Sequence, residues 1–316
     1  MRQGTLANAG FEKYGRPTRR AAFLAEMEAI VPWDALYREI EPHYPRAGGG
    51  RRPVGLDRML RIYFLQHWYN LSDPGAEEAL YDSPTLRGFA GIDLGREPVP
   101  DETTICKFRH LLERHDIGGR LLARVNEHLA KQGIRVSRGT IVDATTIAAP
   151  TSTKNAARAR DPDMGSVAKG RQWYFGMKAH VGVDSRTKVI HTVCVSSASV
   201  HDAVMLPRLL HGNETRVWGD QAYRGQTAVI RRCAPAASDF TNRSYRYRDR
   251  VDQAEKSRNQ NKSRVRAKVE HSIGVIKRVF GFTKVRYRGL AKNAHRLYVA
   301  CALANLFITR RRLLAA

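Results

Sequence analysis

The chain has 316 residues, 42% of them hydrophobic, which is enough for a sizeable core and about two domains. Its 54 lysine and arginine residues against 30 acidic residues give a formal charge of +24, so we expect a polyanionic partner, with nucleic acid as the first candidate. Four dispersed cysteines match neither a zinc motif nor a disulfide framework, and no apolar tract is long enough for a membrane span, which favours a cytoplasmic protein. Charge alone leaves open a ribosome-associated or generally adhesive basic protein.

The first part of the chain, from residue 17 to about 134, carries helical patterns. Segment 54–71 is apolar on most sides, which predicts a buried core helix. Asp101 is suited to cap a helix in which apolar residues recur at helical spacing. We therefore predict an all-helical N-terminal domain over residues 1–136.

The pattern changes near residue 137, where short β-branched segments begin. Segment 140–147 is predicted to be a strand, and segments 173–183 and 189–195 are predicted to be two strands of a hairpin. A further strand is expected to end on Asp220. We predict a mobile loop at 151–171, an irregular basic insertion around 224–262, then a helix carrying Glu270 and a last apolar helix. The expected fold class is α/β, with a mixed sheet flanked by helices over residues 137–316.

Three carboxylates stand out by their positions in this second domain. Asp143 lies inside an apolar strand, Asp220 ends another strand, and Glu270 lies on a helix. Burying a carboxylate costs several kcal/mol unless it is paired or binds a cation. Each residue alone could be a helix cap or a paired core acid. Three converging carboxylates instead favour hard divalent cations such as Mg²⁺, and two such ions support phosphodiester displacement.

The helix around Glu270 also presents two cations beside the carboxylate. Arg266, Glu270 and Lys277 fall within about 40° of one another on an ideal helix. This arrangement could combine a metal ligand with side chains that bind phosphate. A separate apolar row on the same helix is predicted to be buried, comprising Val265, Val269, Ile276 and Phe280.

The last third of the chain is strongly basic. Between Arg243 and Arg296 there are 17 lysine and arginine residues against four acidic ones. This could be a solvated surface, but interleaved aromatic residues favour a DNA-binding surface, because aromatic rings can stack on bases. We expect Arg286 and Arg288 to project to one side, and Lys178 to share a strand face with His180. The aromatic residues are Tyr245, Tyr247, Phe282 and Tyr287.

Several motifs together resemble one family. The segments Ile141-Val-Asp143-Ala-Thr, Trp218-Gly-Asp220-Gln-Ala-Tyr223 and Arg266-x₃-Glu270-x₆-Lys277 resemble the Asp-Asp-Glu (DDE) transposases of bacterial insertion sequences, in particular the insertion-sequence-five group. Pro100-Asp-Glu-Thr-Thr104 and Val200-His-Asp202 are also similar to that group. The resemblance extends from about residue 10 to residue 310, and the order and spacing of the motifs make it specific.

The resemblance implies an RNase H-like core with its two aspartates on adjacent strands and its glutamate on a later helix. It implies cleavage at terminal inverted repeats and transfer of the 3′ hydroxyl into target DNA. Asp143, Asp220 and Glu270 would bind two Mg²⁺ ions, for which Mn²⁺ could substitute. Arg266 and Lys277 would contact DNA, and the helical domain would bind the ends of the element. We expect a homodimer or larger assembly on DNA.

Two departures and two alternatives accompany this interpretation. Ser263 occupies a position where related groups place a tyrosine, and Gln221 stands where a lysine is frequent. The resemblance therefore does not carry the role of that tyrosine over to this chain. An RNase H-like nuclease without strand transfer, or an inactive DNA-binding repressor derived from an element, would carry similar motifs.

Overall fold

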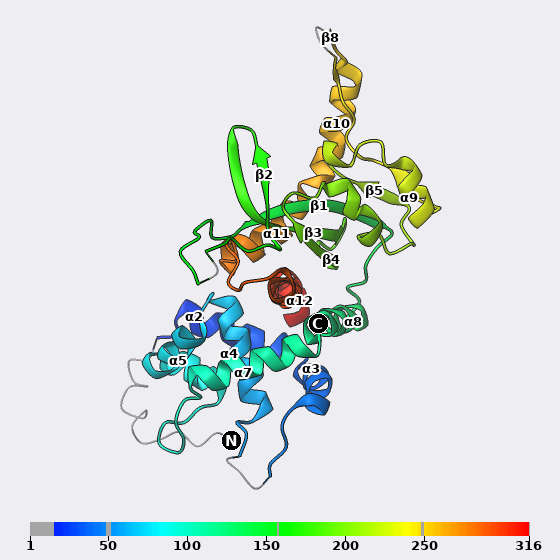
Figure 1. The fold of residues 1–316 in the computed structure, drawn as a ribbon. Helices are drawn as coiled ribbons and strands as arrows, with labels where there is room; N and C mark the ends of the chain where they lie inside the picture. Colours follow the sequence, from blue (N-terminus) through cyan, green and yellow to red (C-terminus); the bar gives the residue numbers. More distant parts are fainter. Residues whose placement is uncertain (1–15, 49–51, 157, 248–249, 316) are drawn as a thin grey trace.

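A computed structural model describes residues 16–48, 52–156, 158–247 and 250–315. The first fifteen residues of the predicted helical domain therefore lie outside the described residues. Helices form one part of the molecule and a mixed sheet forms the other, with the last helix between them (Figure 1). The helical part contains α2 (Arg19–Ile30), α3 (Trp33–Ile40), η2 (Glu41–His43), α4 (Leu56–Trp68), α5 (Asp73–Asp82), α6 (Pro84–Ala90), α7 (Glu102–Arg114) and α8 (Ile117–Lys131).

The predicted helices of the N-terminal part are confirmed. Segment 54–71 contains α4, with nine buried residues covering most of the helix surface. Asp101 caps α7 by accepting a 2.7 Å hydrogen bond from the Thr104 amide. Side chains that accept a first-turn amide satisfy donors that a helix leaves unpaired, which defines where it begins.

The second part is built on a six-stranded mixed sheet in the order β2-β3-β1-β5-β6, with β4 also paired to β3. The predicted hairpin is confirmed, because β3 and β4 pair in antiparallel register. β1 pairs antiparallel with β3 and parallel with β5. The strands are β1 (Gly139–Ala148), β2 (Gly165–Lys169), β3 (Gln172–Asp184), β4 (Ile190–Ser197), β5 (Arg216–Trp218) and β6 (Ser238–Asp239).

Short helices and one long projection complete this part. Tyr223, Val142 and Cys194 belong to a small core on one sheet face, and the opposite face packs into the large core shared with the helices. The elements are η3 (Asp202–Arg208), η4 (Gln221–Tyr223), α9 (Thr227–Cys233), β7 (Arg246–Tyr247), β8 (Arg250–Val251), α10 (Gln253–Arg266), α11 (Lys268–Gly274), the π-helical turn η5 (Val275–Val279) and α12 (Leu290–Leu314).

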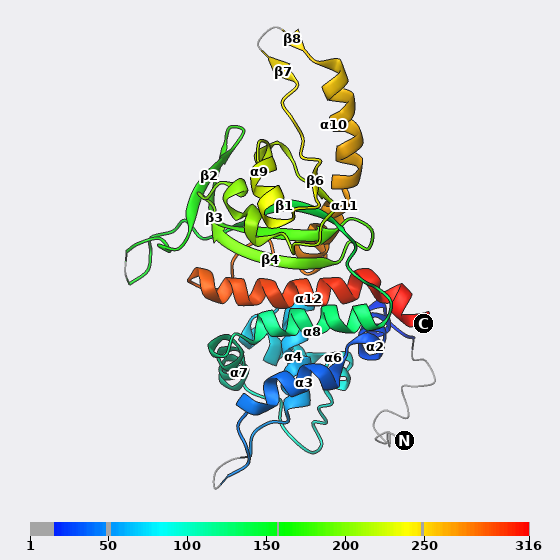
Figure 2. The same ribbon diagram turned by 90° about the vertical axis from the view of Figure 1, so that its right-hand side faces the viewer.

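Two sequence-based expectations for this part are wrong. The insertion at 224–262 is not irregular throughout, because it contains α9, β6, a small hairpin and most of α10, which projects from the sheet (Figure 2). α10 has almost no apolar stripe, so its sequence lacks the usual helical signal. Asp252 caps it, and the Asn259 amide holds both backbone groups of Arg243 at 3.1 and 2.8 Å. The segment 151–171, expected to be a loop, contains β2.

Two composition-based expectations can be compared with the described residues. All four cysteines are free, and Cys194 and Cys301 are buried. Among the helices that the structure describes, none combines the length and apolar character needed to cross a bilayer.

α12 joins the two parts of the molecule. It lies between the sheet and the helices α8 and α2 (Figure 2). Asn305, near its middle, is fully buried and accepts a 2.8 Å hydrogen bond from the Ile190 amide. Its amide nitrogen donates to the Ile190 carbonyl and to Asn126 of α8, both at 2.8 Å. One side chain therefore connects α12, strand β4 and α8.

Replacing Asn305 with alanine should lower the free energy of unfolding by about 2–4 kcal/mol, because buried partners on β4 and α8 lose their hydrogen bonds. Urea unfolding measures this change. Asn213→Ala, at an exposed loop position, is the matched control and should change the free energy by about 0.5 kcal/mol or less. Equal effects of the two substitutions would contradict the linking role of Asn305.

Candidate active site

Asp143 and Asp220 lie where two parallel strands separate. β1 and β5 pair from Gly139↔Arg216 to Ile141↔Trp218, and each aspartate lies two residues beyond that last pair. Both carboxylates therefore lie just past the end of the β1–β5 pairing, although β1 itself continues to Ala148 beside β3. In open α/β sheets, the crevice beyond the carboxyl ends of such strands is the usual place for ligands.

The Asp143 carboxylate is largely removed from solvent, with 15% of its side chain exposed. It accepts hydrogen bonds from the Ala144 amide at 2.8 Å and from Arg266 at 3.1 Å. Burial, together with the negative charges of Asp220 and Asp202, raises the pKa of Asp143 to about 6, against the opposing effects of Ala144 and Arg266. Asp143 is therefore only partly ionised at mildly acid pH.

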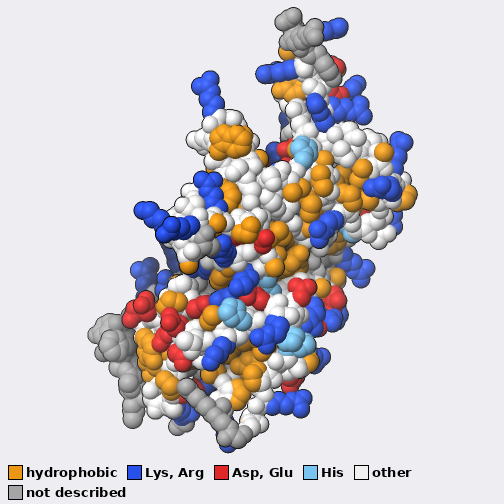
Figure 3. Space-filling model, viewed as in Figure 1, with side chains coloured by type: hydrophobic (Ala, Val, Ile, Leu, Met, Phe, Trp, Pro, Cys, Tyr) orange, Lys and Arg blue, Asp and Glu red, His pale blue; other side chains and the backbone are white. Residues whose placement is uncertain are grey.

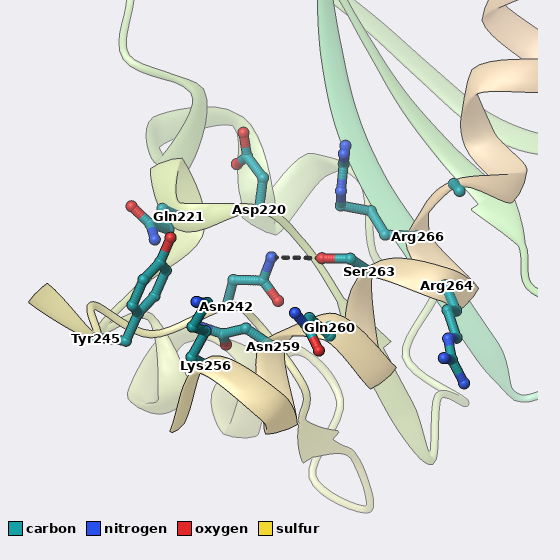
Figure 4. A pocket seen from close by; sticks show the side chains of 11 residues that line it. Asp220, Gln221, Asn242, Tyr245, Lys256, Asn259, Gln260, Ser263, Arg264 and Arg266 are labelled. Carbon is teal, nitrogen blue, oxygen red and sulfur yellow. Dashed lines mark hydrogen bonds between the residues drawn. The ribbon is translucent and has the colours of Figure 1, made fainter. Parts of the chain in front are cut away.

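Asp220 is fixed by the short helix that follows it. Its carboxylate accepts a 2.9 Å hydrogen bond from the Ala222 amide at the start of η4. Asp220 and Arg266 also line an open cavity of 830 Å³ between the sheet and α10. Figure 4 shows the Asp220 carboxylate and the Arg266 guanidinium pointing to the same side, with Asn242 below them and Tyr245 beside Gln221. The cavity thus extends from Asp220 along α10.

Glu270 is linked to Asp143 through Arg266. It lies on α11 with 62% of its side chain exposed and accepts a 3.3 Å hydrogen bond from Arg266. The same guanidinium donates to Asp143, so Arg266 links two of the three predicted carboxylates. Among the described residues, no three acidic, histidine or cysteine side chains are gathered closely enough to hold a metal ion. A guanidinium thus occupies the space between Asp143 and Glu270 in this structure.

The helix that carries Glu270 differs from the single helix predicted. α10 ends at Arg266, α11 begins at Lys268, and a π-helical turn follows from Val275 to Val279. Lys277 lies within this π turn, which holds more residues than an α turn. It donates to Thr145 at 3.2 Å and to the Thr146 carbonyl at 2.9 Å, close to Asp143 on β1. In the predicted apolar row, three residues are buried and Val265 is partly buried, the three being Val269, Ile276 and Phe280.

Three other predicted DNA-binding residues have different surroundings. Lys178 is buried, pairs with Asp202 at 2.8 Å and donates to the Val200 carbonyl at 2.7 Å. Arg286 donates to the backbone and side chain of Asn70 at 2.7 and 2.8 Å. Arg288 is exposed and makes no polar contact with the described residues. Arg288 is therefore the most available of the three for a ligand in this structure.

The expected row of DNA-stacking aromatic residues is wrong for two of its members. Phe282 is buried in the core, and the Arg109 guanidinium lies 4.2 Å from the ring centre of the half-buried Tyr287. The Phe282 ring therefore packs in the core, and the Tyr287 ring packs against Arg109. Tyr245 lines the cavity beside Asp220. The Tyr247 side chain lies outside the part of the chain that is described.

Sequence reasoning gave Asp202 only as part of a motif and missed its position beside the site. Its charge contributes to the raised pKa of Asp143 and it holds the buried Lys178. The available signal was a carboxylate at the first position of a helix, in the segment that follows β4. His180 points to the same region, but burial lowers its pKa to about 4, and it hydrogen-bonds Ser196 at 2.8 Å. His180 is therefore held within the sheet by its hydrogen bond to Ser196.

Comparison with known families adds to this geometry. The family model described as "Transposase DDE domain" matches residues 135–306. A second model, described as "Transposase domain (DUF772)", matches residues 13–111. No solved structure matches the chain significantly. The first match covers more than half of the chain and includes all three carboxylates.

Asp143→Asn should stabilise the fold at neutral and alkaline pH. A raised pKa means that the folded state prefers the protonated acid, so this stability is complete below about pH 4 and is lost as the pH rises through about 6. The neutral amide should therefore unfold at a free energy about 2 kcal/mol higher at pH 8 and show little difference at pH 4. Urea unfolding at both pH values tests this. Destabilisation at pH 8 would contradict the assignment of Asp143 as a buried acid whose pKa is raised in the folded state.

Proposed function

The chain belongs to the DDE transposases of insertion sequences, and on that premise we propose which of its residues cleave and join DNA. It is a transposase, an enzyme of the polynucleotidyl transferase and endonuclease class that acts on DNA. The mixed sheet flanked by helices, after a helical N-terminal part, agrees with the predicted RNase H-like class. The family matches do not separate insertion-sequence groups, so membership of the insertion-sequence-five group stays a prediction.

The family uses a divalent metal, and Asp143, Asp220 and Glu270 are the residues proposed to hold it. The main support is the position of the two aspartates beyond the last residue pair of β1 and β5. Carboxylate oxygens suit Mg²⁺, and burial, with the nearby charges of Asp220 and Asp202, raises the pKa of Asp143, so a bound cation would favour its ionised form. We propose two Mg²⁺ ions, with Mn²⁺ as a substitute. Bound there, the ions would supply an activated attacking oxygen and stabilise the leaving oxygen.

Arg266 must change partners for all three carboxylates to share a metal site. It now donates to Asp143 and Glu270, so its guanidinium fills the place that a cation would take. Release from both acids would free it to bind a DNA phosphate in a bidentate manner. Arg266 would thus have two successive partners: Asp143 and Glu270 before metal binds, and a DNA phosphate afterwards.

The remaining basic residues are proposed to position DNA around this centre. Lys277 lies beside Asp143 on β1, and Arg288 is exposed next to the start of α12. Lys178 and Arg286 would reach DNA only after giving up Asp202 and Asn70.

The helical part, residues 1–136, is proposed to bind the ends of the element. The second transposase match lies within it, and Asn70 joins it to the catalytic part through Arg286 and Arg296. Because two ends must be joined to one target, a homodimer or larger assembly is expected on DNA. Binding of the terminal inverted repeats and of target DNA completes the proposed set of partners.

Asp220→Asn and Glu270→Gln should each reduce DNA cleavage about a thousandfold, because each removes a charged ligand that contributes several kcal/mol to the transition state. The measurement is cleavage of a duplex that contains the DNA flanking the coding sequence, in the presence of Mg²⁺. Glu41→Gln, which changes an exposed acid of the helical part, should leave cleavage unchanged. Cleavage unaffected by Asp220→Asn would refute the metal-site assignment.

The products of the same reaction distinguish the alternatives. A joined product, in which a 3′ hydroxyl has been transferred to target DNA, supports the transposase mechanism. Hydrolysis without joining would favour a nuclease, and tight DNA binding by unmodified protein without any cleavage would favour a repressor.

DNA binding should weaken steeply with salt, because each lysine or arginine that neutralises a phosphate releases counterions. The logarithm of the binding constant should fall with the logarithm of salt concentration at a slope of about −0.9 for each phosphate contact. Arg288→Ala should make this slope about 1 unit less steep without altering sequence preference. A flat salt response would contradict a binding mode dominated by phosphates.

A further inference from the structure

Trp173 is an exposed ring on a narrow projection of the sheet. With 75% of its surface exposed, it has the largest exposed fraction among the large hydrophobic residues that are described. The chain's other tryptophans, Trp33, Trp68 and Trp218, are buried or partly buried. Exposure of one large ring on a hairpin, when the others pack inside, calls for a functional explanation.

The projection is formed by β2 and the first residues of β3. β1 pairs with β3 only from Gly176 onward, so residues 172–174 pair with β2 alone. The turn at its tip contains Gly170, whose φ of +62° suits glycine, and Arg171. Figures 1 and 2 both show this hairpin rising from the sheet on the same side as α10, away from the helical part.

The Trp173 ring packs little against the described part of the chain. Its partner across the hairpin is Ala168, which is too small to cover an indole. Neighbouring rings do have partners, since Tyr174 donates to Gln172 at 2.7 Å and Arg160 lies 5.4 Å from the ring centre of Phe175. Among the side chains that the structure describes, no ring or cation stacks on Trp173. Its ring is therefore free to contact a partner.

The positive charge of the projection indicates a negatively charged partner. Segment 165–176 contains Lys169 and Arg171 and no acidic residue, in a chain with a formal charge of +24. Figure 3 shows exposed hydrophobic atoms on this projection with basic side chains nearby. A basic two-stranded ribbon has the width to enter a DNA groove, and aromatic rings stack on bases of any sequence. A second copy of this chain, equally basic, is the less favoured occupant.

We propose that Trp173 stacks on a DNA base displaced from the duplex near the cleavage site. The inference rests on the proposed function, because it needs DNA held across Asp143 and Asp220. On β3, Val181 pairs with Asp143, eight residues after Trp173. At about 3.3 Å per strand residue this is roughly 26 Å, or about 8 base pairs of DNA at 3.4 Å each. The displaced base should lie within that distance of the scissile phosphate.

Permanganate tests the proposal directly, because it oxidises thymines that have left the duplex stack and keep one ring face open. The probe is the duplex flanking the coding sequence, with thymine placed in turn at each position near the cleavage site. It is bound by full-length Asp220→Asn protein, so that no cutting occurs. One reactive thymine is expected with Trp173, none with Trp173→Ala, and a reactive thymine again with Trp173→Phe, which keeps a stacking ring.

Affinity for the same duplex provides a second readout. Trp173→Ala should bind roughly 5- to 100-fold more weakly, the range found for loss of base–aromatic stacking. Gln172→Ala, the neighbouring substitution on the same projection, is the matched control and should bind within about twofold of the parent, since it keeps the ring. Unchanged thermal unfolding would show that the fold of each variant is intact.

The outcomes separate this inference from the proposed function. If the duplex is cleaved by the parent protein but no thymine becomes reactive, or if Trp173→Ala keeps the reactive thymine, the stacking role of Trp173 is overturned and the transposase assignment stands. If Trp173→Ala instead abolishes self-association without DNA and leaves permanganate reactivity unchanged, the ring serves a second copy of the chain. Failure of the parent protein to cleave tests the proposed function and not Trp173.

Discussion

The short parallel pairing of β1 with β5 is the constraint on which the site depends. Only three residue pairs join the two strands, and the strands separate just before Asp143 and Asp220. A longer pairing would use the backbone beside Asp143 for the sheet and close the crevice. A shift by one residue would turn Asp143 toward the opposite sheet face, away from Arg266. The register of β1 and β5 and their early separation therefore place the Asp143 and Asp220 carboxylates beside the same crevice.

Arg266 supplies positive charge beside the carboxylates that this register brings together. Burial raises the pKa of Asp143, and the negative charges of the nearby Asp220 and Asp202 raise it further. The guanidinium on α10 offsets part of this cost by donating to Asp143 and Glu270. A residue that occupies a cation's place also competes with that cation. We infer that metal and DNA together displace Arg266, which would limit metal-loaded protein in the absence of substrate.

The sequence predicted the strands of the site well, because their β-branched runs and bounding turns act locally. The i, i+4 relation of Arg266 and Glu270 also held, since it depends only on helix geometry. Spacing could not reveal the π turn that holds Lys277 or its hydrogen bonds to β1. Nor could it reveal that the Lys178 ammonium pairs with Asp202 from a different segment, or that polar contacts with the preceding loop stabilise α10. Tertiary contacts therefore decided what local patterns could not.

The central claim is that Asp143, Asp220 and Glu270 share one metal centre when DNA is bound. Anomalous X-ray scattering from Mn²⁺ in crystals of the DNA complex tests it most directly. We expect manganese peaks coordinated by both aspartates and the glutamate, with Arg266 moved onto a DNA phosphate. Peaks elsewhere, or Arg266 still between Asp143 and Glu270 in a metal-loaded complex, would contradict the account.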